Sequence, residues 1–214
     1  MTPNTPNSQP SDITIPVESV TLPAYLTVPA DTENLVMFVH GAGSSRLSPR
    51  NTYVARMLQE AGLGTLLFDL LTQAEDRVYE NRFDIELITQ RLLAATKWVR
   101  QKYPSLRLQY FGASTGSAAA LNAAAAGSGE IHAVVSRGGR PDLAMEMLPR
   151  VKTPTLFIVG GNDTQVKQLN EQAYAQLECE KSFEVVPGAG HLFEEEGKLE
   201  QVARLSVDWF TSHG

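Results

Sequence analysis

The sequence predicts an α/β fold in which a mostly parallel sheet carries helices on both faces. Short, continuous apolar runs rich in β-branched and aromatic residues alternate with longer segments of helical periodicity up to the end of the chain. Continuous apolar runs are typical of strands buried on both sides, as in parallel sheets. A length of 214 residues with 43% hydrophobic content suits one globular domain with a full core. We therefore expect function where strands end and loops begin.

The N-terminal segment differs in composition from the rest. Its first residues, MTPNTPNSQPS, are polar and proline-rich and lack the basic start and apolar core of a signal peptide. We expect residues 1–12 to be a disordered lead-in and residues 13–214 to form the α/β domain. The stretch ITIPVESVTLPAYLTVPAD then predicts an antiparallel hairpin of two edge strands, because its prolines suit a sheet edge better than a central strand.

The remaining strands and helices are predicted from their periodicity. Each predicted strand is closed by Gly, Asp or Ser, where we expect a loop to begin. The predicted strands fall within residues 34–41, 63–70, 106–114, 131–139, 153–163 and 181–191. The predicted helices span about 50–61, 85–102, 116–126, 141–147, 166–177 and 199–212.

Charge and cysteine usage exclude several classes of protein. A net charge of -6 and a pI near 5.3 argue against nucleic acid or an anionic membrane as a partner, since both require a basic face. No apolar run approaches the about 18 residues of a transmembrane helix. The single cysteine, Cys179, excludes an internal disulfide and a Cys-rich zinc site. We expect a cytoplasmic protein that acts on a small molecule without metal or cofactor.

Residues 112–116, GASTG, form a G-x-S-x-G pattern at the junction of a predicted strand and helix. A serine at the apex of such a turn has a strained backbone and projects its hydroxyl above the sheet, and the small residues Gly112 and Gly116 avoid a clash with it. The helix that follows points its N-terminal amides at charge developing beside Ser114. The pattern also arises by chance, but its position between strand and helix favours a nucleophile.

Two further strand ends carry the residues that would accompany a nucleophilic serine. Asp163 follows an apolar run in VGGNDTQV, and His191 follows the next run in VPGAGHLF. The order Ser, Asp, His along the chain matches the order in α/β-hydrolases. Over residues 13–214 the chain resembles the α/β-hydrolase fold, and it is most similar to the dienelactone-hydrolase-like branch. The resemblance implies that Ser114 is the nucleophile, His191 the general base and acid, and Asp163 the residue that orients the imidazole.

Other interpretations of these residues remain open. Asp163 could be a helix N-cap instead of a catalytic acid, and we expect it to fill both roles together less easily than either one. His191 could be a surface-loop histidine. Asp142 and the glutamates at 194–196 are competing acids. We favour Asp163 because the acid must approach from a strand end next to the nucleophile strand, whereas the glutamates follow His191 too closely. The weaker histidine candidates are His40, His132 and His213, the last in the frayed tail.

The segment FVHGAGSSR predicts the second half of an oxyanion hole. Acyl transfer places negative charge on the former carbonyl oxygen, and preorganised backbone amides stabilise it. Thr115 supplies one amide directly after the nucleophile, and the resemblance implies that Ala42 supplies the other. A plain Gly-rich turn is the alternative. His40 is expected to be structural and to tie down this loop.

The resemblance transfers the scaffold but not the substrate. Dienelactone hydrolases proper carry cysteine as nucleophile, whereas this chain has Ser114. The segment SRGGRPDLA resembles a group of bacterial dienelactone-hydrolase-like proteins that are sometimes joined to a phosphoribosyltransferase domain. We expect no such second domain in this chain, which has no G-x-x-x-x-G-K-[ST] motif and no spare length.

The expected reaction is hydrolysis of a small ester, lactone or thioester through an acyl-enzyme. One alternative is a non-catalytic ligand-binding or scaffolding member of the fold, against which a complete triad and oxyanion loop argue. Another is a peptidase or amide hydrolase with the same triad. Only RGGRPDLAMEMLPRVK separates AVVS from TPTLFIV, so we expect no large cap and a preference for short acyl chains.

Three arginines close to the predicted strand ends suggest a negatively charged substrate. Arg46 follows the oxyanion turn, Arg137 stands near the end of the predicted strand at 131–139, and Arg140 comes directly after it. Guanidinium groups bind carboxylate or phosphate bidentately, and a positive site attracts such substrates. The alternative is that Arg140 pairs with Asp142 and Arg46 with another carboxylate.

Overall fold

The computed structural model describes residues 7–127 and 130–214, and within them eight strands form one sheet. The strand order is β1-β2-β4-β3-β5-β6-β7-β8; β2 is antiparallel to both β1 and β4, and the strands from β4 to β8 in this order run parallel to one another. This confirms the mostly parallel sheet with an N-terminal antiparallel hairpin. The strands are β1 (Asn7–Val17), β2 (Val20–Val28), β3 (Asn34–Val39), β4 (Gly64–Phe68), β5 (Arg107–Ala113), β6 (Ile131–Arg137), β7 (Thr155–Gly160) and β8 (Lys181–Val186).

The hairpin differs from the prediction in two respects. Strand β2 is not an edge strand, because it pairs with β1 on one side and with β4 on the other. Pro23 is tolerated there because the pairing with β4 starts one residue later, at Ala24. Strand β1 already begins at Asn7, so the expectation of a disordered lead-in is wrong for residues 7–12. Residues 1–6 lie outside the described part of the chain.

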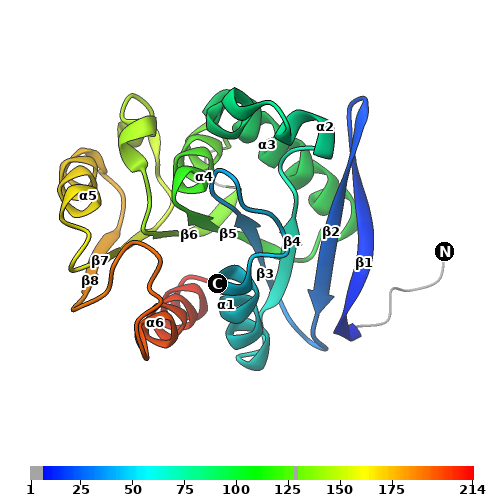
Figure 1. Cartoon of the computed structure of the whole chain (residues 1–214). Helices are drawn as coiled ribbons and strands as arrows, with labels where there is room; N and C mark the ends of the chain where they lie inside the picture. The colour runs from blue at the N-terminus through cyan, green and yellow to red at the C-terminus, as the bar shows by residue number, and fades with distance from the viewer. Residues whose placement is uncertain (1–6, 128–129) are drawn as a thin grey trace.

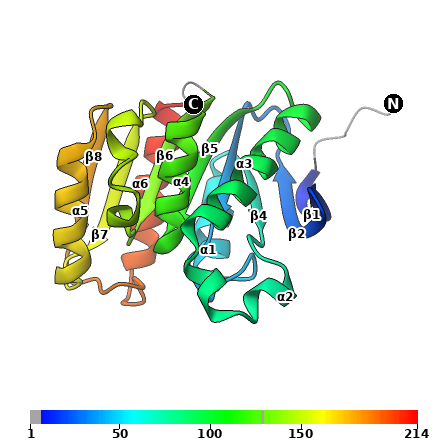
Figure 2. The same ribbon diagram turned by 90° about the horizontal axis from the view of Figure 1, so that it is seen from above.

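Helices cover both faces of the sheet, as predicted (Figure 1). Helices α3, α4 and α5 lie on one face and α1 and α6 on the other, and Figure 2 shows the same layers from above. The helices are α1 (Pro49–Glu60), α2 (Gln73–Asp76), α3 (Ile85–Lys102), α4 (Thr115–Ala126), α5 (Thr164–Gln176) and α6 (Lys198–Ser212). Within residues 7–127 and 130–214, none of the helices is long and apolar enough to cross a membrane.

Several connections contain short helical turns that were predicted wrongly or not predicted. The helix expected at 141–147 is instead two 3-10 turns, η2 (Pro141–Ala144) and η3 (Leu148–Arg150). Their i→i+3 bonds do not continue into α-helix, and prolines occupy the start of both turns. Helix α2 and the 3-10 turn η1 (Tyr79–Phe83) were not predicted. The connection between β6 and β7, which holds η2 and η3, is too short for a cap domain.

The core consists of two apolar layers, one on each side of the sheet. Successive residues of one strand point to opposite faces, so Met37 packs in the layer under α3 and α4 while Phe38 packs in the layer under α1 and α6. Tyr110 and Phe111 on β5 divide in the same way. This two-sided burial is why the strands read as continuous apolar runs.

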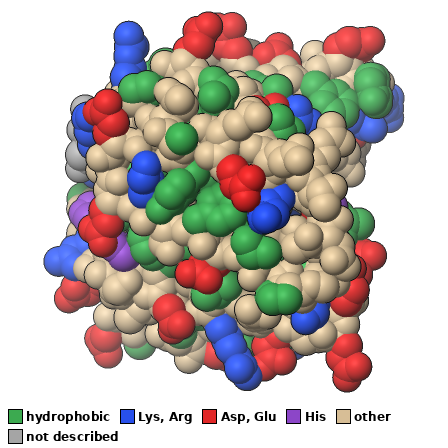
Figure 3. Space-filling model, turned by 90° about the vertical axis from the view of Figure 1, so that its left-hand side faces the viewer, with side chains coloured by type: hydrophobic (Ala, Val, Ile, Leu, Met, Phe, Trp, Pro, Cys, Tyr) green, Lys and Arg blue, Asp and Glu red, His purple; other side chains and the backbone are tan. Residues whose placement is uncertain are grey.

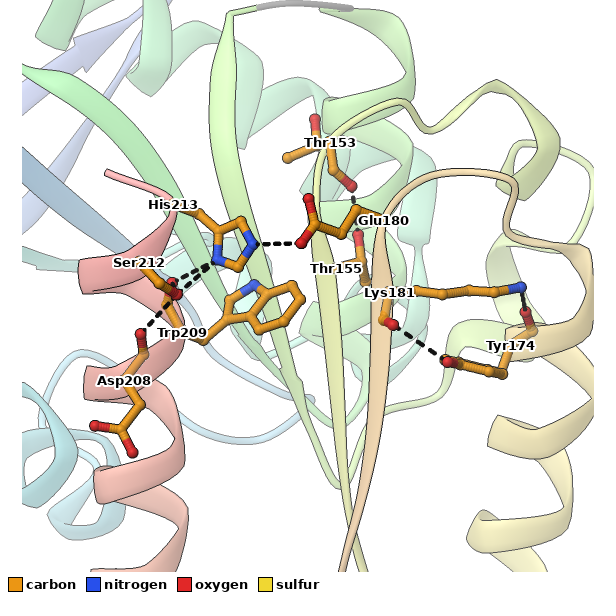
Figure 4. Close-up of polar contacts among 9 residues, drawn as sticks. All are labelled: Thr153, Thr155, Tyr174, Glu180, Lys181, Asp208, Trp209, Ser212 and His213. Atoms are coloured by element: carbon orange, nitrogen blue, oxygen red, sulfur yellow. Dashed lines mark hydrogen bonds and ion pairs between the residues drawn. The ribbon is translucent and has the colours of Figure 1, made fainter.

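The C-terminal end of α6 is tied to the sheet. His213 packs its ring against Trp209, and its Nε2 lies 3.1 Å from Oε1 of Glu180, the residue before β8 (Figure 4). Its Nδ1 lies 2.8 Å from the Trp209 carbonyl oxygen. The expectation of a frayed tail at His213 is therefore wrong, and this histidine has a structural role far from the other predicted site residues.

The far edge of the sheet is formed by β8, with α5 beside it. Figure 3 shows this side of the molecule, where acidic and basic side chains are scattered among apolar and neutral ones. Strand β8 itself carries Lys181 and Glu184. Charged residues on an edge strand discourage pairing with the edge of another sheet.

Candidate active site

Ser114 stands in the turn between β5 and α4 with a positive φ of 50° and a ψ of -124°. Non-glycine residues rarely adopt such a conformation, which costs about 1–3 kcal/mol and persists only where the surroundings enforce it. Since α4 starts at the next residue, its unpaired N-terminal amides lie directly beside the serine. The strained turn that the G-x-S-x-G pattern predicts is present.

The two glycines of the pattern allow the close packing that holds this turn. A Cβ on Gly116 would lie 2.1 Å from the Val39 carbonyl oxygen, and a Cβ on Gly112 would lie 2.6 Å from the Ser117 Cα. Contacts this short with backbone atoms cannot be relieved by moving a side chain. Helix α4 can therefore start against the end of β3 only because both positions lack a side chain.

The end of β6 and the loop after it form backbone hydrogen bonds with Ser114. Ser114 donates its amide to the Arg137 carbonyl oxygen at 3.2 Å, and Arg140 donates its amide to the Ser114 carbonyl oxygen at 3.0 Å. The buried Asn170 of α5 donates to the Gly139 carbonyl oxygen at 2.9 Å and so fixes this loop. Sequence reasoning missed Asn170, whose only signal is a polar residue on the inner face of a helix.

Asp163 and His191 meet at the carboxyl ends of β7 and β8. Asp163 Oδ2 lies 2.7 Å from Nδ1 of His191, and Nε2 of the ring has no hydrogen-bond partner in the described part of the chain. Asp163 is also the N-cap of α5, where its Oδ1 accepts the Val166 amide at 3.4 Å. The carboxylate thus combines the contact to the imidazole with the N-cap contact, which we expected to be hard to combine, because each contact uses a different oxygen.

The competing acids have other partners. Asp142 forms two 2.8 Å hydrogen bonds with the Arg140 guanidinium. Glu194 accepts a 2.8 Å hydrogen bond from Arg50, and Glu195 accepts the Gly190 amide at 2.9 Å. Among these acids, in the part of the chain that the structure describes, only Asp163 forms a hydrogen bond with His191.

Ser114 and His191 line one cavity of about 240 Å³ at this edge of the sheet. Its walls come from the loop after β3, the start of α1, the ends of β5 and β6, and the loop after β8. The described residues that line it include no Asp or Glu. The lining residues are Gly41, Ala42, Ser44, Ser48, Arg50, Asn51, Ala113, Ser114, Arg137, His191 and Leu192.

His40 holds the loop that forms one wall of the cavity. The ring is buried, its Nδ1 donates to the Gly41 carbonyl oxygen at 3.0 Å, and its Nε2 accepts the Leu70 amide at 3.1 Å. Burial lowers the pKa of His40 below its ordinary value, which the Gly41 carbonyl and the charge of Asp69 only partly oppose. The predicted structural role of His40 is confirmed.

The two amides expected to form an oxyanion hole lie next to each other but differ in their partners. The Ala42 amide donates to Thr115 Oγ1 at 2.8 Å. No hydrogen-bond acceptor for the Thr115 amide is found among residues 7–127 and 130–214. Gly41 packs closely against the serine, since a Cβ there would lie 3.0 Å from Ser114 Cβ. The loop after β3 and the start of α4 thus form one surface beside the hydroxyl.

The three arginines do not form the expected cluster. Arg46 contacts Asp69 through its amide at 2.7 Å and its guanidinium at 2.5 Å, and Arg140 is paired with Asp142. Neither lines the cavity beside Ser114. Arg137 does line it, together with Arg50, which sequence reasoning missed because Arg50 lies in a helix rather than in a strand-end loop.

Comparison with known proteins places this architecture in a family. The family model for the alpha/beta hydrolase fold matches residues 34–151. Two Mycobacterium tuberculosis proteins, each named "Putative phosphoribosyl transferase", are 50% identical over 210 residues, which is 97% of this chain and 47% of theirs. The chain therefore spans about half the length of the curated relatives it matches.

Similarity to solved structures supports the same family assignment. A dienelactone hydrolase from Anabaena variabilis is 49% identical, with a TM-score of 0.93 over 96% of this chain and 98% of that one. Est1E from Butyrivibrio proteoclasticus, 16% identical with a TM-score of 0.81 over 94% of this chain and 98% of its own, shares the fold. Because the likeness to the Anabaena protein extends over nearly the full length of both chains, this chain belongs to the α/β-hydrolase fold family and to its dienelactone-hydrolase-like branch.

Proposed function

We propose that this protein is a serine hydrolase that cleaves a small ester, lactone or thioester through a covalent acyl-enzyme. One observation carries the proposal: the strained Ser114 shares a cavity with His191, whose Nδ1 lies 2.7 Å from Asp163. A nucleophile, a base and a group that orients the base are the parts that acyl transfer requires. The names of the Anabaena dienelactone hydrolase and of Est1E agree with hydrolysis of an ester bond.

In the proposed mechanism, Ser114 Oγ attacks the substrate carbonyl carbon while His191 Nε2 accepts the hydroxyl proton. The tetrahedral intermediate collapses, the bond to the leaving group breaks, and the imidazolium returns the proton to the leaving group. A water molecule then attacks the acyl-enzyme by the same sequence and frees Ser114. Asp163 supports both steps because its hydrogen bond to Nδ1 keeps the proton there and leaves Nε2 free to act as a base.

Negative charge on the intermediate would be stabilised by the Thr115 and Ala42 amides. Each oxyanion-hole donor is worth about 3–4 kcal/mol in comparable enzymes. The Thr115 amide, at the start of α4, has no acceptor among the described residues, and the helix dipole there also favours an anion. The Ala42 amide donates to Thr115 Oγ1 in this structure, so we propose that the oxyanion takes over this hydrogen bond.

The proposed substrates are short. A cavity of about 240 Å³ accommodates a scissile carbonyl with a few further carbon atoms. The connection after β6 is occupied by η2 and η3, and a long acyl chain would leave the cavity for solvent.

We also propose that the reaction takes place in the cytoplasm. Cys179 is a free, half-buried thiol, and burial raises its pKa, which makes it a poor nucleophile and metal ligand. A single free thiol of this kind suits a reducing compartment.

Labelling with a fluorophosphonate, followed by a panel of acyl esters, thioesters and peptides, tests the proposal. We expect the reagent to modify Ser114 alone and the wild-type protein to hydrolyse short esters. Ser114→Ala should abolish both, whereas Ser44→Ala, a change in the lining of the same cavity, should preserve labelling. A protein that neither reacts nor turns over any ester would be a non-catalytic member of the fold, and a preference for peptides would make it an amide hydrolase.

A further inference from the structure

The guanidinium of Arg137 is buried without a carboxylate. Among residues 7–127 and 130–214, its only side-chain partner is Asn51 Oδ1, which accepts a hydrogen bond from Nη2 at 3.1 Å. Arg137 is 7% exposed, and its buried Nε has no hydrogen-bond partner among these residues. Arg46 and Arg140, by contrast, each have a carboxylate within 2.8 Å. A buried charge is costly unless it is paired, and the described residues give Arg137 no carboxylate partner that would offset this cost.

The surroundings of Arg137 make the cavity more positive still. Arg50 lines the same cavity, and its own partner, Glu194, is a largely exposed residue outside the lining. Burial, and then the charge of Arg50, lower the pKa of Arg137 to about 10, so the group stays charged at neutral pH. The first turn of α1, with Ser48 as N-cap, adds the positive end of a helix dipole.

We propose that the cavity beside Ser114 contains an anion subsite in which Arg137, assisted by Arg50, binds a carboxylate or phosphate carried by the substrate. The inference deepens the proposed function and rests on it for the identity of the reacting group. The free Nε–H and the Nη groups of Arg137 suit the two oxygens of a planar or tetrahedral anion. Because the cavity is small, the anionic group must lie a few bonds from the scissile carbonyl. The substrate class is therefore a half-ester, thioester or lactone of a short acid that carries a second negative charge.

Binding of the anion can be tested without catalysis. In a Ser114→Ala background, glutarate and inorganic phosphate are titrated while the midpoint of thermal unfolding is measured, which tests the carboxylate and the phosphate separately. A ligand that binds only the folded protein raises this midpoint. We expect at least one anion to stabilise Ser114→Ala and the matched control Ser114→Ala/Arg140→Gln, but not Ser114→Ala/Arg137→Met. If neither anion stabilises Ser114→Ala, or if the Arg137→Met protein responds equally, the subsite does not exist.

A pair of substrates tests the subsite in turnover. Mono-p-nitrophenyl glutarate and p-nitrophenyl pentanoate differ mainly by one carboxylate. We expect wild-type kcat/KM to be higher for the glutarate and the ratio of the two to fall about 10-fold or more in Arg137→Met, with the pentanoate changed by less than about 3-fold. Arg140→Gln should keep the wild-type ratio. Equal loss on both esters would show that Arg137 is structural and would overturn the proposal.

Two further measurements keep the result clear. Because Arg137 has no carboxylate partner, Arg137→Met should leave the unfolding midpoint unchanged or raise it. If Arg137→Met does not fold, Arg50→Gln, whose side chain is 31% exposed, should still lower the glutarate-to-pentanoate ratio by about 3-fold, and an unchanged ratio would overturn the proposal. Turnover that survives Ser114→Ala would disprove the nucleophile but not the subsite, since the titration does not depend on hydrolysis.

Discussion

His40 and His191 both stand just past the carboxyl ends of parallel strands, yet their surroundings are opposite. His40 follows β3 and is buried, with both ring nitrogens bonded to the backbone of Gly41 and Leu70. His191 follows β8, its side chain is 39% exposed, and within the described residues only Nδ1 has a hydrogen-bond partner, Asp163. The same side chain at the same edge of the sheet is thus a structural link in one loop and a candidate proton carrier in the other.

The difference teaches that the partners of the two ring nitrogens, rather than position at a strand end, decide what a histidine can do. A ring bonded to backbone at both nitrogens is fixed in one tautomer, and burial disfavours its charged form. A ring that has a carboxylate at one nitrogen and none at the other can accept a proton and return it. Four measurements test this contrast between the two histidines.

The largest expected effect separates the two histidines directly. His191→Gln should lower kcat on a short ester by about 1,000-fold or more while leaving the unfolding midpoint near that of wild type, because the ring supports catalysis and not the fold. His40→Gln should lower stability by about 1–3 kcal/mol but keep kcat of the folded protein within a few-fold. A larger loss of kcat in His40→Gln than in His191→Gln would reverse the assignment.

The second effect separates the two roles of Asp163. Asp163→Asn should lower kcat by about 100- to 10,000-fold, because the amide no longer holds the proton on Nδ1 of His191. Its stability should change little, since asparagine is as good an N-cap as aspartate for α5. Asp142→Asn is the matched control, and a greater loss of activity there would transfer the role of the acid to Asp142.

The third effect follows from the open surroundings of His191. With only η2 and η3 between β6 and β7, the site has no cap that a lipid surface could displace. We expect kcat/KM for p-nitrophenyl butyrate to exceed that for the dodecanoate about 10-fold, and micelles to bring no sudden increase in rate. Strong interfacial activation would show that a segment closes over His191.

The smallest effect is a pH dependence of stability that arises from His40. Its pKa is lower in the folded protein than in the unfolded chain, so the unfolded state binds more protons below about pH 6.5. The stability that neutral His40 contributes is therefore complete above this pH and is lost as the pH falls toward the folded-state pKa. The unfolding midpoint of wild type should fall more between about pH 7.5 and 5.5 than that of His40→Gln. The pKa of the exposed His132 is also lowered, by partial burial and then by the charges of Arg107 and Arg100, so His132→Gln should reduce this fall as well. A fall in His40→Gln equal to that of wild type would show that His40 does not contribute.

Much of the fold was predictable because it depends on local pattern. Continuous apolar runs mark strands buried on both faces, and the small residues at Gly112 and Gly116 are required by the turn they flank. The helix expected at 141–147 was wrong because the composition of this segment does not reveal that its backbone hydrogen bonds close as the i→i+3 turns η2 and η3. Strand β2 was mistaken for an edge strand because pairing with β4 is a long-range contact.

The sequence by itself determined the strand-turn-helix around Ser114 and the order of the strand ends that carry Asp163 and His191. These features depend on residues close together in the chain, where backbone sterics and periodicity act. Only the tertiary structure decided which charges are paired. Arg137 and Arg140 lie three residues apart, yet one is buried in the cavity without a carboxylate and the other is bonded to Asp142. The physical reason is that a side chain's direction and its partner are set by packing between elements distant in sequence, which local pattern does not encode.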